Sequence, residues 1–213
     1  MKKFCDKYSV SRETFLKLKK CQSMLEEWQQ KFNLISKSTI DNAWDRHFLD
    51  SAQLFNFIPQ DAEVLFDFGS GAGFPGIVLA IMANEKMPKL QINLVESINK
   101  KTVYLNAVKT ELGVNVNVIN DRIEKIKPQK ANVITSRALA SLTDLLSYSY
   151  KFSDKNTICI FPKGKKYKEE LLEAHKHWKF KCKVYPSEQS DEGKILIITN
   201  LIKGKGENKC QEF

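Results

Sequence analysis

An aspartate followed by four glycines stands out in the stretch VLFDFGSGAGFPGIVLA, residues 64–80. The aspartate is Asp67, and the glycines are Gly69, Gly71, Gly73 and Gly76. An apolar run precedes Asp67, and another with helical spacing follows the last glycine, so we expect a strand, a sharp turn and a helix. Glycines permit positive φ angles and let a ligand approach the backbone closely. The pattern therefore predicts a turn whose free N–H groups face a bound ligand.

Two cofactors fit this turn. Residues 71–76 satisfy the G-x-G-x-x-G fingerprint of nicotinamide dinucleotide enzymes. Asp67 with three alternating glycines also satisfies the nucleotide-binding turn of S-adenosyl-L-methionine-dependent methyltransferases. Glu96 follows Gly76 by 20 residues and ends a predicted strand, where an acid binds ribose hydroxyls. The turn leaves both cofactors open, although 213 residues leave little chain for the substrate domain of a nicotinamide enzyme.

Short apolar runs alternate with helical patterns after the turn. We expect strands over residues 64–68, 90–96, 114–120, 131–136 and 157–162. This alternation predicts a mostly parallel, doubly wound α/β sheet that binds ligands at the carboxyl ends of its strands. Two further strands, 181–187 and 194–202, are joined by a short turn-rich segment and predict an antiparallel hairpin at the sheet edge. Such a hairpin agrees with the methyltransferases.

The first 60 residues predict helices. Apolar residues recur at three- and four-residue steps through 11–32, after Ser11 as the N-cap. Ser38 and Asp41 fit a capping box that opens a second helix, which Pro59 ends. We therefore expect one structural domain overall. It comprises a helical extension (1–60), a Rossmann-like domain (61–202) and a frayed tail (203–213).

The net charge of +9 is unevenly distributed. Residues 1–20 carry seven Lys and Arg against two acids, and residues 163–183 carry eight lysines against three glutamates. Two basic regions around an ordinary middle favour a polyanionic partner such as nucleic acid.

The remaining composition excludes several classes of protein. No apolar run approaches the ~18 residues of a membrane span, and no secretory signal follows the first lysines, so we expect a cytoplasmic protein. Five scattered cysteines without a C-x-x-C pair argue against a disulfide framework and against a zinc site. We expect no metal and, because nothing demands a dimer, a monomer.

Five motifs occur in a characteristic order. They are NLIS (33–36), WDRHFLDS (44–51), DFGSGAGFPGIVLA (67–80), DRIEK (121–125) and TSRALASL (135–142). In this order and at these spacings they resemble the RsmG family, also called GidB or glucose-inhibited division protein B. The resemblance extends from about residue 20 to 200. It implies a class I, Rossmann-like methyltransferase fold and the S-adenosyl-L-methionine-dependent methylation of guanine N7 in 16S rRNA of the small ribosomal subunit.

The turn pattern and the resemblance together predict the residues of the site. The cofactor-binding residues are Asp67, Gly69, Gly71, Gly73, Phe74, Glu96, Ile123, Glu124 and Arg137. Of these, the resemblance implies that Glu96 binds the ribose and that Ile123 and Glu124 lie by the adenine. The residues expected to contact rRNA are Arg46, Lys163, Lys165 and Lys166. The three lysines follow the fifth strand at the ligand-binding edge, where they could contact phosphates.

Transfer of a methyl group to guanine N7 needs alignment more than a general base, because N7 carries a lone pair in the neutral base. We therefore assign no catalytic residue and take Arg137 as a positioning candidate, whose fork could orient the donor carboxylate or the guanine acceptors O6 and N7. His47 could be pH-sensitive or could only pack in the helical seam. A nicotinamide oxidoreductase and a non-catalytic RNA-binding protein of this fold are the alternatives.

Overall fold

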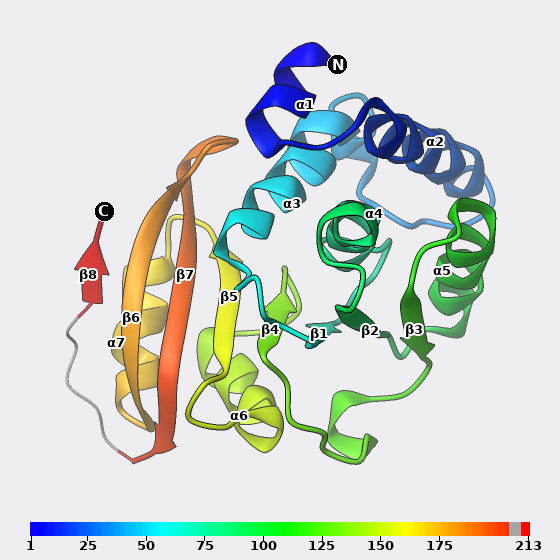
Figure 1. The fold of residues 1–213 in the computed structure, drawn as a ribbon. Coiled ribbons are helices and arrows are strands. Elements are labelled where there is room, and N and C mark those ends of the chain that lie inside the picture. The colour runs from blue at the N-terminus through cyan, green and yellow to red at the C-terminus, as the bar shows by residue number, and fades with distance from the viewer. Residues whose placement is uncertain (205–209) are drawn as a thin grey trace.

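The computed structural model describes residues 1–204 and 210–213, whose strands form a single sheet. The strands are β1 (Val64–Phe68), β2 (Gln91–Val95), β3 (Val116–Ile119), β4 (Val133–Ser136), β5 (Ile158–Lys163), β6 (Trp178–Ser187), β7 (Ser190–Lys203) and β8 (Cys210–Glu212). Their order is β3-β2-β1-β4-β5-β7-β6-β8 (Figure 1). The first five are parallel, whereas β7 runs antiparallel to β5 and β6. The predicted parallel sheet with a C-terminal antiparallel hairpin is confirmed.

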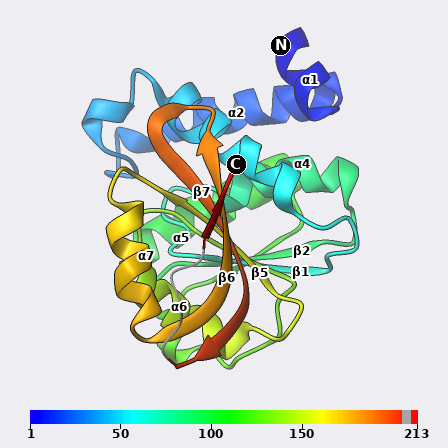
Figure 2. The same cartoon turned by 90° about the vertical axis from the view of Figure 1, so that its left-hand side faces the viewer.

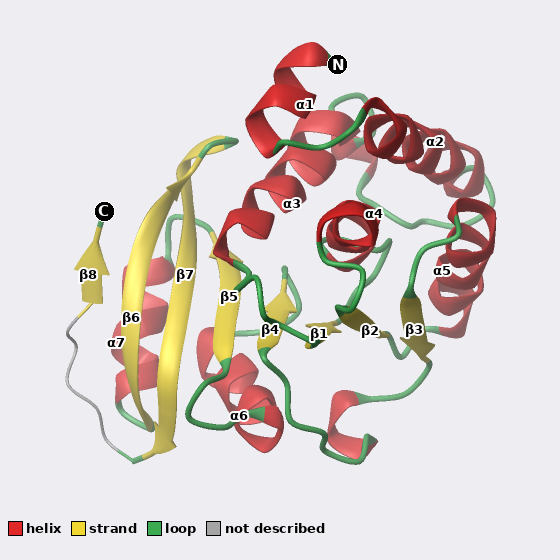
Figure 3. Cartoon of the chain, in the orientation of Figure 1, coloured by secondary structure: helices red, strands yellow, loops and turns green. Residues whose placement is uncertain are grey.

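Helices cover both faces of this sheet. They are α1 (Lys2–Tyr8), α2 (Arg12–Gln29), α3 (Asp50–Ala52), α4 (Gly76–Lys86), α5 (Asn99–Leu112), α6 (Leu142–Phe152) and α7 (Tyr167–His175). The helices α4 and α5 lie on one face, with α2 outside them, and α6 and α7 lie on the other (Figures 1 and 3). Because both faces are covered, β1 is buried from Leu65 to Phe68.

Local sequence signals set two helix ends, and the one predicted at Ser11 is confirmed. The side chain of Ser11 caps α2 by accepting a hydrogen bond from the Thr14 N–H at 3.1 Å. Gly113 ends α5 in the left-handed region with φ 59°. The first 60 residues share one hydrophobic cluster with α4, since Leu18, Leu25 and Phe48 all pack in it. Figure 2 shows α1 and α2 above α4, on the side of the sheet away from α6.

The segment that leads to β1 differs from the expected continuous helix. A 3-10 turn (Lys37–Thr39) precedes a π-helical segment (Trp44–Leu49), then α3 and a 3-10 turn (Gln53–Phe57). The capping box from Ser38 is therefore wrong. The winding ends at Ile58 in an extended conformation, immediately before Pro59 as predicted. π-Helical segments are frequent at functional sites, and this one carries the WDRHFL motif.

The tail also differs from the expectation of fraying. Residues 205–209 lie outside the described part of the chain. Residues 210–212, however, form β8, which pairs with β6 in parallel. Phe213 continues this attachment, because its N–H donates to the Val184 carbonyl and its ring stacks on Tyr185. The sheet edge is therefore β8 and not the hairpin.

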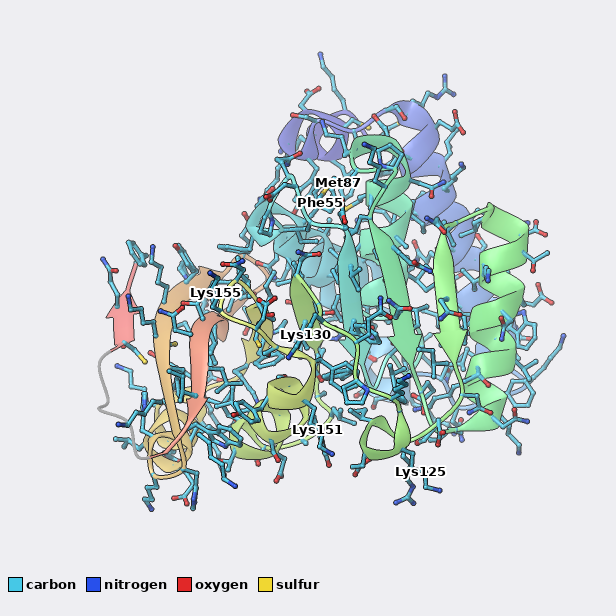
Figure 4. All side chains as sticks on the ribbon, turned by 60° about the horizontal axis from the view of Figure 1, so that its bottom comes forward. Phe55, Met87, Lys125, Lys130, Lys151 and Lys155 are labelled. Carbon is cyan, nitrogen blue, oxygen red and sulfur yellow. The ribbon has the colours of Figure 1, made fainter. Side chains whose placement is uncertain are left out.

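Figure 4 labels four exposed lysines, Lys125, Lys130, Lys151 and Lys155. Lys130 and Lys155 come three residues before β4 and β5 respectively, so they mark the amino-terminal edge of the sheet. The glycine turn lies at the opposite, carboxyl edge.

Candidate cofactor and substrate site

The glycine turn after β1 has the backbone that its composition predicts. Gly69, Gly71 and Gly73 have φ angles of 67°, 56° and 90°, in the region that favours glycine. The N–H groups of Gly69 and Ser70 both donate to the Val95 carbonyl, at 2.9 and 3.0 Å. The turn is therefore fixed to the end of β2, which brings the two carboxyl ends together.

Asp67 supports the turn from beneath. It is fully buried, and its carboxylate accepts hydrogen bonds from the Thr135 hydroxyl at 2.8 Å and the Gly76 N–H at 3.1 Å. These contacts join β1 to β4 and to the start of α4. Burial raises the pKa of Asp67 to about 6. Asp67 and Gly73, both predicted to bind the cofactor, are not among the residues that line the cavities described next.

Two cavities meet above the turn. The larger has a volume of about 820 Å³ and the smaller about 350 Å³. Five residues line both: Gly69, Lys101, Ala138, Leu139 and Ala140. Leu139 packs against the turn between them, because its Cδ1 atom lies 2.7 Å from the point that a Cβ on Gly69 would occupy. Together the cavities form one elongated site at the carboxyl edge of the sheet, where α/β folds bind ligands.

The smaller cavity brings together Glu96, Ile123 and Glu124, all predicted to be cofactor-binding residues. Glu96 is buried, and its carboxylate accepts hydrogen bonds from the N–H groups of Gly71 at 2.9 Å and Ile98 at 2.7 Å. Among the lining residues that the sequence analysis missed are Asp121 and Tyr148. Asp121 belongs to the DRIEK motif, but nothing in the sequence connects Tyr148, on α6, with this edge. The cavity is lined by apolar side chains such as Ile123 and by carboxylates such as Glu96, a combination that suits a nucleoside.

The larger cavity contains a cluster of Phe74, His47 and Arg137. The His47 ring stacks on Phe74 with centroids 5.0 Å apart and planes at 22°, and the Arg137 guanidinium carbon lies 5.2 Å from the Phe74 centroid. An Nη2–H of Arg137 donates to Nδ1 of His47 at 2.8 Å. The structure therefore brings the turn, β4 and the π-helical segment together at one point. His47 packs in the seam, as one of its two expected roles required.

Arg137 is held by two further acceptors. Its Nη1 donates to the backbone carbonyl of Arg46 at 2.9 Å and to the Asp50 carboxylate at 3.2 Å. The side chains of Arg137 and Asp50 are 18% and 19% exposed, so this ion pair is mostly shielded from water. Burial lowers the pKa of Arg137, and the Asp50 carboxylate opposes that change. The guanidinium is therefore fixed in the wall of the larger cavity by three acceptors.

The residues expected to contact rRNA do not form one group. Arg46 is exposed and lines the larger cavity, and Lys165 and Lys166 are exposed before α7. Lys163 is different: its side chain is only 9% exposed, donates to the Ala140 carbonyl at 3.1 Å and pairs with Glu170 at 2.7 Å. Lys163 is thus engaged within the protein, although it lines the larger cavity as Arg46 does, and its contact with rRNA stays a prediction.

Two lysines at the larger cavity escaped sequence analysis. Lys101 lies in the first turn of α5, directly after β2, and Lys194 lies near the tip of the β6–β7 hairpin. The position of Lys101 after a parallel strand was a usable signal. That of Lys194 was not, because only the folded hairpin brings its tip to the cavity. No cysteine is among the lining residues of either cavity, and within residues 1–204 and 210–213 no helix is long and apolar enough to cross a bilayer.

Comparisons with known proteins bear on this site. The family model described as rRNA small subunit methyltransferase G matches residues 15–194. The ribosomal RNA small subunit methyltransferase G of Cereibacter sphaeroides is 42% identical over 192 residues, which cover 90% of this chain and 93% of that protein. The protein of the same name from Rhodospirillum centenum is 38% identical over 194 residues, covering 91% and 88%.

The fold has a counterpart among solved structures. The structure of M. jannaschii TYW2 in complex with AdoMet matches with a TM-score of 0.54 and 12% identity, over 80% of this chain and 78% of that one. At this identity the match shows the fold, which is the predicted class I methyltransferase fold. The comparisons agree with S-adenosyl-L-methionine as the cofactor and give no support to a nicotinamide coenzyme or to a non-catalytic role. The chain belongs to the rRNA small subunit methyltransferase G family, as its motifs predicted.

Proposed function

We propose that this protein transfers a methyl group from S-adenosyl-L-methionine to N7 of a guanine in 16S rRNA of the small ribosomal subunit. One observation carries the proposal: a small cavity suited to a nucleoside joins a larger, cation-lined cavity above the glycine turn. The first is suited to the adenosine of the donor and the second to the donor's amino-acid end and the acceptor base. Family membership supports the choice of rRNA.

The residues of the smaller cavity fit the nucleoside of the donor. Glu96 keeps acceptor capacity beyond its two backbone hydrogen bonds and faces the cavity, so it can accept from ribose hydroxyls. Ile123 supplies an apolar surface for the adenine, and the Glu124 carboxylate adjoins it. At Gly71 an added Cβ would meet nothing closer than 3.8 Å, so the backbone there is open to a ligand.

The chemistry requires little from the chain beyond alignment. When bound, S-adenosyl-L-methionine supplies a methyl group on a positively charged sulfur. The bond from carbon to sulfur breaks as the bond from carbon to N7 forms, and the positive charge passes to the base. No side chain has to remove a proton, because N7 presents a lone pair in neutral guanine. The cavity walls therefore act by positioning both partners, which contributes about 7–11 kcal/mol in well-aligned reactions.

The rRNA would approach over the exposed and half-buried cations around the larger cavity. Arg46, Lys101 and Lys194 line it, and Lys165 and Lys166 lie on the same edge of the sheet. Such contacts with phosphates provide affinity without sequence readout. An enzyme that modifies a base takes it out of the stack, so selection of the guanine comes from a base turned into the cavity. We propose that one monomer, folded as a single domain, is sufficient.

Methylation of defined RNA tests the proposal. Small subunits and naked 16S rRNA from cells that lack the gene are incubated with the purified protein and isotopically labelled donor. Nucleoside analysis and mapping then identify the product. We expect label in 7-methylguanosine at one position of 16S rRNA. Label in another nucleoside would overturn the N7 assignment, and no transfer to either substrate would overturn the proposed function.

A further inference from the structure

Arg137 retains two hydrogen-bond donors for a ligand. A guanidinium has five N–H groups, and Arg46, Asp50 and His47 accept from three of them. The Nε–H and the second Nη2–H have no acceptor among the described residues. These two groups belong to adjacent nitrogens of one planar group, an arrangement that a carboxylate accepts in a bidentate manner. Arg137 lines the larger cavity, so its free donors can meet a ligand there.

The orientation of Arg137 depends on the protonation of His47. Because arginine only donates, Nδ1 of His47 must accept, and the imidazole proton must lie on Nε2. That Nε2–H donates to the Thr39 hydroxyl at 3.0 Å. The Thr39 hydroxyl in turn donates to the Ser36 carbonyl at 2.8 Å, so it can only accept from His47. Thr39 therefore selects the one tautomer that can hold Arg137.

The charge of the surroundings keeps His47 neutral. The groups that face it are Arg137 from the end of β4 and Arg46 and Asp50 from its own segment. Burial, followed by the two arginines, lowers the pKa of His47 to about 4. A protonated imidazole would direct an N–H at the N–H of Arg137 and release it. Neutral His47 is thus the state compatible with the observed geometry across the physiological pH range.

The ring of Phe74 links this chain of hydrogen bonds to the turn. His47 and Arg137 both pack on it, and Phe74 directly follows Gly73 of the turn. The guanidinium therefore lies beside the glycine turn, where the methyl donor is expected to bind. The donor carries one anionic group, its carboxylate, and a positive sulfur. A guanidinium stabilises the first and repels the second, so the carboxylate is the partner that suits Arg137.

We propose that His47 and Thr39 are positioning residues that hold Arg137 so that its two free N–H groups bind the carboxylate of the methyl donor. This inference rests on the proposed function, because it takes S-adenosyl-L-methionine as the methyl donor. It adds the residues that fix the amino-acid end of that donor. His47 and Thr39 touch neither the donor nor the base in this role, and they act through Arg137.

Binding of two matched ligands tests the proposal. S-adenosyl-L-methionine and its decarboxylated analogue share the adenosine, the sulfonium and the amine, and differ in the carboxylate. Calorimetry is performed with the wild type and with His47→Leu, which fills the space without an acceptor. We expect the affinity for S-adenosyl-L-methionine to fall about tenfold, as for one hydrogen bond to a charged group. The affinity for the decarboxylated analogue should stay within about twofold.

Further variants separate positioning from folding. His47→Asn keeps an acceptor close to Nδ1 and should recover most of the affinity that His47→Leu loses. Thr39→Val removes the acceptor for Nε2–H of His47. It should lower the affinity for S-adenosyl-L-methionine but not that for the decarboxylated analogue, whereas Thr39→Ser should change neither. His177→Leu and Thr110→Val, both on the exposed surface, are the matched controls. Thermal unfolding of each variant shows whether it is folded.

The tautomer has its own readout. Nitrogen NMR of the histidine rings in the wild type should show His47 protonated at Nε2 and not at Nδ1 from pH 8 to pH 5. In Thr39→Val the other tautomer should appear. An Nδ1–H tautomer in the wild type, or equal losses for both ligands in folded His47→Leu, would overturn the role of His47. Failure of the wild type to bind S-adenosyl-L-methionine at all would instead overturn the proposed function.

Discussion

The carboxylate of Glu96 accepts the N–H of Gly71 at 2.9 Å, so the acid that ends β2 also holds the turn that follows β1. Its other oxygen accepts the Ile98 N–H at 2.7 Å. Glu96 thus has two functions in the same geometry. It fixes the backbone of the turn, and it presents its remaining acceptor capacity to the smaller cavity.

Substitution of Glu96 by Gln tests this double role. One carboxylate oxygen would become an NH2 group facing a backbone N–H, so a donor would meet a donor. We expect Glu96→Gln to lower the affinity for S-adenosyl-L-methionine and for its decarboxylated analogue alike, by about tenfold or more. The melting temperature should also fall. Glu111→Gln, in an exposed ion pair with Lys20, is the matched control for calorimetry. Unchanged affinity for both ligands would remove Glu96 from the ribose site.

Two glycines of the turn should respond differently to alanine. At Gly73 an added Cβ would lie 2.6 Å from Cγ1 of Ile77, whereas at Gly71 the nearest atom is 3.8 Å away. Both have positive φ, which costs alanine about 1 kcal/mol in each case. We expect Gly73→Ala to be the less stable by a further 1–3 kcal/mol, roughly the cost of overpacking.

Gly71→Ala should instead impair donor binding, because its methyl group would project toward the ligand space. Chemical denaturation and calorimetry on both variants separate the two effects. A Gly71→Ala variant with wild-type affinity would show that the donor does not approach the backbone there.

The buried carboxylate of Asp67 makes stability depend on pH with a defined sign. Its pKa is raised from 3.8 to about 6, so between these values the folded chain holds a proton that the unfolded chain has released. Through this group, stability decreases as pH rises from about 4 to about 6 and is then constant. Asp67→Asn lacks this dependence and retains an acceptor for the Gly76 N–H.

Between pH 4 and pH 7 the free energy of unfolding of Asp67→Asn should therefore rise by roughly 3 kcal/mol relative to that of the wild type, at about 1.4 kcal/mol per pKa unit. Urea unfolding of both proteins at several pH values measures the difference. A difference that does not change with pH would show that Asp67 titrates normally.

The lysines near β5 should have two different roles: Lys163 stabilises the fold, and Lys165 and Lys166 bind RNA. Lys165→Ala with Lys166→Ala should reduce the salt dependence of rRNA binding by up to about two ion contacts, without a change in melting temperature. The matched control is Lys151→Ala with Lys155→Ala at the opposite edge of the sheet, which should leave binding unchanged.

Lys163→Ala should mainly lower stability, because it leaves the Glu170 carboxylate without its partner in a mostly buried pair. Filter binding across a salt series and thermal unfolding give both quantities. A loss of RNA affinity in a fully stable Lys163→Ala variant would contradict the structural role of this lysine.

The sheet and the turn could be predicted because their causes are local. Alternating apolar runs define β1 to β5, and Gly113 marks the end of α5 through its own φ angle. The smaller cavity could also be predicted, since Glu96 and the DRIEK motif follow neighbouring parallel strands. In each case the residue type and its place in the strand order carried the information.

The larger cavity could not be predicted to the same depth, because its causes are contacts between distant segments. Nothing near His47 indicates that Arg137, 90 residues later, will donate to it. Nor does the sequence indicate that the segment containing His47 will form a π-helix. The sequence alone does not distinguish Lys163 from Lys165 and Lys166, and only its contacts with Glu170 and Ala140 in the folded chain do so. Periodicity cannot encode such pairings.

The short strand β8 has a consequence for association between molecules. It hydrogen-bonds to the outer side of β6, which is ten residues long. Without β8, that long strand would expose a row of backbone donors and acceptors to which a strand of another molecule could be added. Removal of residues 210–213 is therefore expected to favour association between molecules through β6, which size-exclusion chromatography would detect as a larger apparent mass.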